Sequence, residues 1–102
     1  MKKNIILAHI SELKENSSKI IFHKGMAIAL FRIKSGFYAI ENRCPHIGGS
    51  LGDGMIDGNE VSCPWHKWKF DIRSGISPEN INCRVKTISV YIEDNLIKLS
   101  HE

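Results

Sequence analysis

The sequence predicts an all-β domain with antiparallel strands and one irregular insertion, and three observations support this fold class. Short β-prone runs recur along the chain, and turn residues separate them. Five of the eight glycines lie within eleven positions, 48–58, which marks a segment unlike the rest. With 102 residues, 42% of them hydrophobic, the chain is long enough for one domain with its own core.

The first part of the chain predicts consecutive hairpins. Residues 10–15 are expected to make one helical turn, with Ser11 as a possible cap, and 16–18 a polar turn. The run at 26–33 is apolar on both alternations, as expected for a strand covered on both faces. The strands expected here are 4–8, 19–23, 26–33 and 37–40.

The remaining strands complete the predicted base and the insertion. A small hairpin around Asp57-Gly58 is expected to join strands at 55–57 and 59–61. The alternating run 85–93 and the strand 96–100 should form a hairpin around Asp94-Asn95. We therefore expect a single domain over 1–102. Its antiparallel sandwich or barrel base is formed by roughly 1–40 and 77–102, with a loop-rich insertion at roughly 41–76.

Two short clusters in the insertion each hold one thiol and one imidazole. The first is Cys44-Pro45-His46, and sixteen residues later comes Cys63-Pro64-Trp65-His66. Thiolate and neutral imidazole are good metal ligands, and two of each form the donor set of a Rieske [2Fe–2S] centre. A structural zinc site can use the same four donors, although Cys44-x-His46 is tighter than the usual zinc-finger spacing. The glycines and prolines suit stiff loops that approach a metal group closely.

At these residues the chain resembles the Rieske ferredoxin family, whose pattern is Cys-x-His, about sixteen residues, then Cys-x-x-His. The flanks at 48–51, 70–71 and 74–75 and the terminal hairpin are also similar to the family. The resemblance implies one [2Fe–2S] cluster, with both cysteines on the inner iron and both histidines on the outer iron near the surface. The implied ligands are Cys44, His46, Cys63 and His66.

The resemblance also implies which residues surround the cluster. Trp65 and Trp68 are expected to shield the cluster from water, and Pro78 to lie in a third loop that covers it. Lys67 stands where the family often has glycine. Lys67, together with Arg43, Lys69 and Arg73, forms either a weakly basic docking rim or ordinary solvated residues. The expected surrounding residues are Gly48, Gly49, Trp65, Lys67, Trp68 and Pro78.

Two departures concern the reduction potential. Rieske proteins of membrane complexes join their ligand loops by a disulfide, but this chain has Gly49 and Trp65 at those positions. They also carry hydroxyl groups where this chain has Trp68 and Phe70. Fewer hydrogen-bond donors to sulfur disfavour the reduced state, so we expect a potential at the low end of the Rieske range, roughly −150 mV.

Composition limits the possible partners and the compartment. The formal charge is +3 with scattered Lys and Arg, which does not indicate nucleic-acid binding. The first apolar run ends at Ala8 and no stretch reaches membrane-spanning length, so we expect a cytoplasmic protein. Cys83 is expected to be a buried or half-buried thiol. The isolated His9, His23 and His101 are expected to be ordinary surface or edge residues.

By resemblance we expect a soluble, monomeric one-electron carrier that is not itself an enzyme. It would pass electrons from a flavin-dependent reductase to the terminal oxygenase of an aromatic-ring-hydroxylating dioxygenase system. Two alternatives remain open: the small subunit of an assimilatory NAD(P)H nitrite reductase, and a zinc-stabilised binding module.

Overall fold

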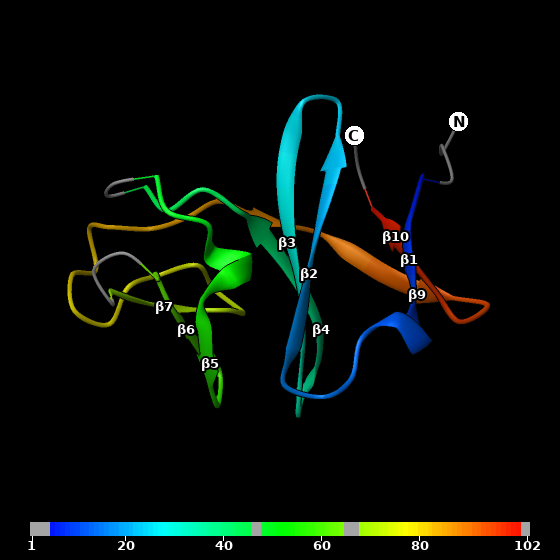
Figure 1. Ribbon diagram of the computed structural model, residues 1–102, viewed down its shortest axis with the longest axis horizontal. Helices are drawn as coiled ribbons and strands as arrows, with labels where there is room; N and C mark the ends of the chain where they lie inside the picture. The colour runs from blue at the N-terminus through cyan, green and yellow to red at the C-terminus, as the bar shows by residue number, and fades with distance from the viewer. Residues whose placement is uncertain (1–4, 46–47, 65–67, 101–102) are drawn as a thin grey trace.

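The computed structural model describes residues 5–45, 48–64 and 68–100. These residues form three antiparallel sheets that follow one another along the long axis of the molecule (Figure 1). Within these ranges there is no α-helix, so the expected all-β antiparallel fold is confirmed. The elements are β1 (Ile5–His9), η1 (Ile10–Glu12), β2 (Ser17–His23), β3 (Met26–Ile33), β4 (Gly36–Glu41), η2 (Leu51–Asp53), β5 (Met55–Asp57), β6 (Glu60–Ser62), β7 (Lys69–Asp71), β8 (Thr87–Ile88), β9 (Val90–Glu93) and β10 (Leu96–Leu99).

The central sheet has the strand order β2-β3-β4-β8, and its inner strand β3 is covered on both faces. Ala29 and Phe31 belong to one apolar core, whereas Ile28 and Leu30 belong to another. All four are fully buried. Because alternate residues of a strand face opposite sides of the sheet, the doubly apolar run lies between two cores, as predicted.

The two cores divide the molecule into a site side and a terminal side. The site-side core contains Ala29, Phe31, Ile33, Ile40, Cys44, Leu51, Val61, Cys63, Phe70, Ile72 and Val85. The terminal core contains Leu7, Ala8, Leu13, Ile28, Leu30, Ala39, Ile97 and Leu99.

The terminal sheet, β1-β10-β9, joins the two ends of the chain. Ile5 pairs with Leu99 across β1 and β10. The β9–β10 hairpin turns at Asp94 and Asn95, whose φ angles of +53° and +63° are those of a two-residue hairpin turn. The turn predicted at these two residues is confirmed.

The third sheet, β5-β6-β7, lies at the opposite end of the molecule from the terminal sheet (Figure 1). Its first hairpin turns at Gly58, which has a φ of +62°, as the Asp57-Gly58 pair predicts. β7 was not expected from the sequence, and it pairs with β6 through Val61 and Phe70. This small sheet carries the second thiol cluster between β6 and β7.

The 3-10 turn after β1 is capped by a residue other than the expected one. His9, not Ser11, is the N-cap: its Nδ1 accepts the Ser11 backbone N–H at 3.1 Å, and the Glu12 carboxylate accepts the His9 backbone N–H at 2.7 Å. These reciprocal bonds form a capping box. The hydrogen bond from the His9 backbone, followed by that from Lys19, lowers the pKa of Glu12 below its ordinary value.

Two strand boundaries also differ from the sequence-based expectation. Ser17 and Ser18 lie in β2 rather than in a turn, because they pair with Arg32 and Phe31 of β3. The run 85–93 is not one strand. β8 pairs with β4 in the central sheet and β9 pairs with β10 in the terminal sheet, so the chain passes between sheets at Ser89.

No helix within the described ranges is long and apolar enough to cross a membrane.

Candidate metal centre

The first thiol cluster lies in a loop between β4 and η2 that is closed by two backbone hydrogen bonds. The Cys44 N–H donates to the Gly49 carbonyl, and the Gly48 N–H donates to the Cys44 carbonyl, each at 2.8 Å. Gly48 has a φ of +79°, a conformation that other residues rarely adopt. Both glycines predicted to surround the site therefore shape the backbone that positions Cys44.

The second thiol cluster lies in the loop that joins β6 to β7. Ser62 pairs with Lys69 at the base of this loop, and the Cys63 N–H donates to the Trp68 carbonyl at 2.8 Å. Gly54 allows η2 to approach β6, because a Cβ atom added there would lie 2.0 Å from the Ser62 carbonyl oxygen. The loop is therefore held at both ends, next to a close backbone contact.

Both predicted cysteine ligands are buried in the same core. Cys44 and Cys63 form no disulfide and have no exposed surface, and both belong to the site-side core with Leu51, Val61 and Phe70. Trp68 is half-buried and packs against this core, as expected for a residue that shields the site. Two cysteines held in closed, water-excluding loops are suitable donors for a metal centre.

The other predicted site residues in these loops lie outside the described residues: His46, Trp65, His66 and Lys67. No group of three or more His, Cys, Asp and Glu side chains that could hold a metal occurs in the part of the chain that the structure describes. Of the four predicted donors, the described residues thus include the two cysteines, Cys44 and Cys63. A cavity of about 290 Å³ adjoins Cys63, and Asp53, Gly54, Met55, Ser62 and Pro64 complete its lining.

A third loop, 77–83, is fastened to the second thiol loop. Within it, the N–H of the buried Ser77 donates to the Cys83 carbonyl at 3.0 Å. The Glu79 carboxylate accepts the Lys69 backbone N–H at 2.8 Å, directly after Trp68. Sequence reasoning assigned no role to Glu79, because no local pattern shows which distant N–H a loop carboxylate will accept.

Other expectations for this region have mixed outcomes. Pro78 is in the third loop as expected, and its side chain is exposed. Cys83 is a half-buried free thiol packed against the site-side core, which confirms the prediction for it. At the other end of the molecule, His23 ends the edge strand β2 as expected, but its Nε2 is buried and has no hydrogen-bond partner among the described residues.

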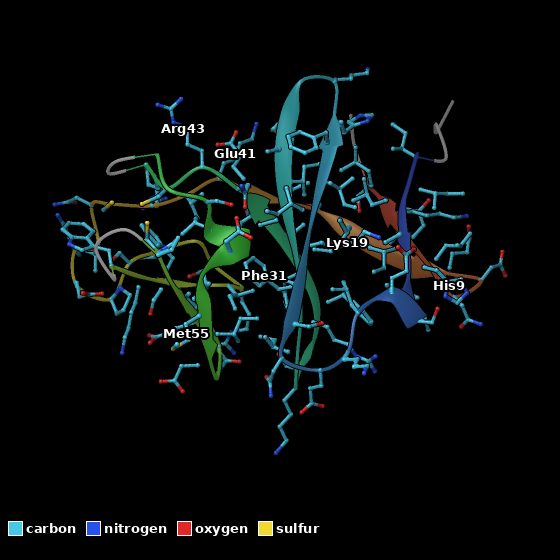
Figure 2. All side chains as sticks on the ribbon, viewed as in Figure 1. His9, Lys19, Phe31, Glu41, Arg43 and Met55 are labelled. Atoms are coloured by element: carbon cyan, nitrogen blue, oxygen red, sulfur yellow. The ribbon has the colours of Figure 1, made fainter. Side chains whose placement is uncertain are left out.

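The cationic side chains near the loops are in different environments. Arg43 is exposed and extends from the first loop (Figure 2), and its guanidinium lies against Gly48. Arg73 forms an ion pair with Asp71 at 3.3 Å. Partial burial alone would raise the pKa of Asp71, but hydrogen bonds from Arg73 and Ser74 outweigh this effect and lower it. Arg73 is therefore already partly neutralised, whereas no described carboxylate pairs with Arg43.

Fold and site together define a small all-β metalloprotein in which two thiol loops meet at one core. The sequence matches the Rieske [2Fe-2S] domain family over residues 3–90, and the chain belongs to this family. It therefore carries one Rieske-type [2Fe–2S] cluster, and the alternative of a structural zinc is not supported.

Individual relatives identify the class within the family. The ferredoxin component of the naphthalene 1,2-dioxygenase/salicylate 5-hydroxylase systems of Ralstonia sp. is 33% identical over 81 residues, 76% of each chain. The ferredoxin component of the naphthalene 1,2-dioxygenase system of Pseudomonas putida is 31% identical over 88 residues, 83% of each chain. The chain is accordingly a ferredoxin, an electron carrier rather than a catalyst.

Two solved structures agree with this fold. The ferredoxin of carbazole 1,9a-dioxygenase from Nocardioides aromaticivorans IC177 superposes with a TM-score of 0.90 over 99% of this chain and 100% of that one, at 23% identity. A protein whose name proposes that it is the small subunit of an NADPH nitrite reductase gives a TM-score of 0.84 at 26% identity, over 96% of this chain and 98% of that one.

Proposed function

We propose that Cys44, His46, Cys63 and His66 hold the cluster, with the cysteines on one iron and the histidines on the other. The observation that carries this assignment is the complete burial of both cysteines in one core, at the ends of two hydrogen-bonded loops. The bound cluster supplies one-electron redox chemistry. The protein positions the donors, excludes water and sets the potential through the charges and hydrogen bonds around the site.

Around these ligands we propose a second layer formed by Gly48, Gly49, Trp65, Lys67, Trp68 and Pro78. The glycine backbone that closes the first loop and the packing of Trp68 on the core support this proposal. We further propose that 1–102 is a single domain with its base at roughly 1–40 and 77–102 and its cluster-binding insertion at roughly 41–76.

The cysteine assignment can be tested with a matched control, because a third cysteine, Cys83, packs against the same core. The purified protein is assayed for iron and acid-labile sulfide, and its absorption and low-temperature EPR spectra are recorded before and after dithionite. Cys44→Ser and Cys63→Ser are expected to lose most of the iron, whereas Cys83→Ser keeps the spectrum. A Cys44→Ser protein with a normal cluster would overturn the assignment.

The histidine assignment needs a different variant, because cysteine can replace histidine as a ligand. His66→Cys should still bind metal while its absorption and EPR spectra change and its potential falls. An unchanged spectrum would contradict ligation by His66.

We propose that the physiological donor is a flavin-dependent reductase and the acceptor a terminal oxygenase of an aromatic-ring-hydroxylating system. The names of the two ferredoxin relatives and the length over which they match support this role. We also propose a soluble, cytoplasmic monomer without nucleic-acid or membrane partners. The test is reconstitution: the reduced protein should transfer electrons to such an oxygenase, with turnover proportional to the concentration of the ferredoxin.

A second candidate is the small subunit of an assimilatory nitrite reductase. The similarity to a protein named for that role favours it. Stable co-purification with a large sirohaem-containing subunit, together with failure to support an oxygenase, would select this alternative over the first.

A further inference from the structure

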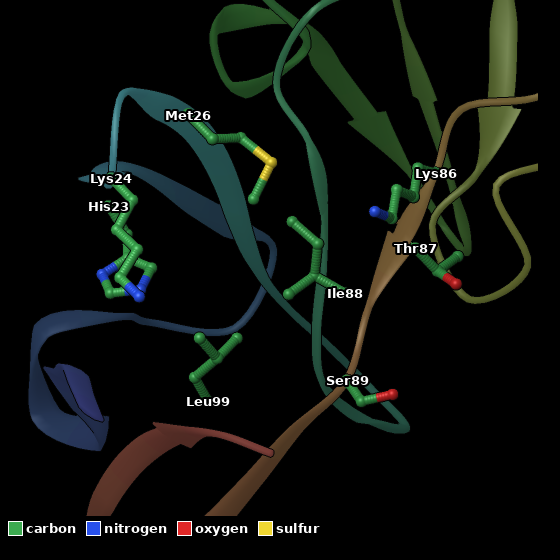
Figure 3. A pocket seen from close by; sticks show the side chains of 8 residues that line it. All are labelled: His23, Lys24, Met26, Lys86, Thr87, Ile88, Ser89 and Leu99. Atoms are coloured by element: carbon green, nitrogen blue, oxygen red, sulfur yellow. The ribbon is translucent and has the colours of Figure 1, made fainter. Parts of the chain in front are cut away.

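A pocket of about 440 Å³ opens on the terminal side of the central sheet, where three segments of the chain meet (Figure 3). It is formed by the β2–β3 turn, the segment around β8, and the end of β10. Its lining residues are His23, Lys24, Met26, Lys86, Thr87, Ile88, Ser89 and Leu99. This volume lies within the range of small-molecule sites, roughly 300–1,000 Å³.

One part of the lining is apolar. Met26, Ile88 and Leu99 come from three different strands, and their side chains gather around the middle of the pocket (Figure 3). All three contribute to or pack against the terminal core. A ligand therefore needs an apolar body to use this surface, which a hydrated inorganic ion lacks.

The rest of the lining is basic or neutral. Lys24 and Lys86 both contribute to the pocket, and the lining residues within the described ranges include no carboxylate. Lys86 is exposed and forms no ion pair with a described residue. The neighbouring Glu41 donates its backbone N–H to the Lys86 carbonyl, but the Glu41 side chain does not line the pocket. The Lys86 ammonium, together with the lack of a carboxylate among the described lining residues, favours an anion at this side of the pocket.

From this combination we propose that the pocket binds a small organic carboxylate with an aromatic or aliphatic body. The apolar body covers Met26, Ile88 and Leu99, and the carboxylate lies by the Lys86 ammonium. The site faces the terminal core, whereas Cys44 and Cys63 belong to the site-side core on the other face of β3. Occupancy therefore leaves the cluster loops uncovered.

Binding should also stabilise the junction between two sheets. Ile88 belongs to the central sheet and Leu99 to the terminal sheet, and the Ser100 N–H donates to the Ser89 carbonyl at 2.9 Å beside the pocket. A ligand that contacts both sheets only in the folded protein raises the unfolding temperature, and the increase grows with the logarithm of the ligand concentration above the dissociation constant.

The test uses the cluster-loaded, oxidised protein and benzoate as the probe, followed by two-dimensional amide NMR. We expect saturable shifts at Thr87–Ser89 and Leu99, weaker binding at higher ionic strength, and much weaker binding of the neutral isostere benzamide. Lys86→Gln should raise the dissociation constant for benzoate up to about fivefold, as expected for one exposed charge. Lys34→Gln, an exposed lysine in the β3–β4 turn, is the matched control and should leave it unchanged.

Three results would overturn the proposal. They are the absence of saturable shifts at the pocket amides, equal binding of benzamide and benzoate, and equal effects of Lys86→Gln and Lys34→Gln. Because the readout is binding to the intact ferredoxin, none of these outcomes depends on which reductase or oxygenase the protein serves.

Discussion

The burial of Phe31 leads to a sharp stability prediction, because the adjacent strand carries a matched phenylalanine. Phe31 on β3 has no exposed surface and packs in the site-side core with both thiols (Figure 2). Phe22 on β2 is 76% exposed. Truncation of a buried phenylalanine to alanine costs roughly 3–5 kcal/mol, whereas an exposed one costs within about 0.5 kcal/mol.

These costs are large relative to the stability of a domain of this size, typically about 5–15 kcal/mol. One kcal/mol corresponds to about 4–8 °C in the unfolding temperature of a 60–100-residue domain, so Phe31→Ala should lower it by at least about 12 °C. The assay is thermal unfolding followed in parallel by far-UV circular dichroism and by cluster absorbance. Because Phe31 shares its core with Cys44 and Cys63, both signals should fall together.

Phe22→Ala is the control and should unfold within a few degrees of the parent protein. If Phe31→Ala does not fold, Phe31→Leu provides a milder test, with an expected cost of about 1–1.5 kcal/mol. Equal unfolding temperatures for Phe31→Leu, Phe22→Ala and the parent protein would refute the assignment of Phe31 to the core that supports the thiols.

Three further predictions concern charge and potential. The reduction potential of the parent protein should be about −150 mV. A midpoint above zero would show that the lack of hydroxyl groups at Trp68 and Phe70 does not control the potential. Glu79→Gln removes a negative charge next to the Lys69 N–H and should raise the potential by up to about 60 mV in a redox titration, whereas Glu15→Gln, at an exposed distant site, should not. Asp71 has a lowered pKa, so its ionised form stabilises the fold above its ordinary pKa of 3.8, and this contribution is lost as the pH falls through the lower folded-state value. Asp71→Asn should therefore be less stable than the parent by about 1 kcal/mol or less near pH 7, with a difference that disappears in acid. A difference of the same size in acid as at neutral pH would show that the turn geometry, rather than the Arg73 ion pair, is responsible.

Several elements could be predicted because their causes are local. The turns at Asp57-Gly58 and Asp94-Asn95 depend on residues that tolerate positive φ, and both occur where expected. The two-sided burial of β3 follows from a run that is apolar on both alternations. Family and cofactor also followed from local spacing, since the Cys-x-His and Cys-x-x-His pairs are read directly from the chain.

Elements that depend on distant partners were missed. β7 is a strand because Val61 and Ser62 of β6 pair with Phe70 and Lys69, and nothing within three residues indicates that pairing. The division of 85–93 depends on the two separate sheets to which β8 and β9 add. The His9 cap was also missed although its partners Ser11 and Glu12 are local, because histidine is not among the residues preferred at an N-cap.

The sequence by itself determined the fold class, the family, the cofactor and the candidate ligands, because these are expressed in residue types at short spacings. The tertiary structure decided which side chains share a core and which loops are joined. It buries Cys44 and Cys63 together, ties Glu79 to Lys69 across ten positions, and brings Met26, Ile88 and Leu99 to one pocket. Such contacts form between residues far apart in the chain, so they depend on how whole sheets pack and are not encoded in any local pattern.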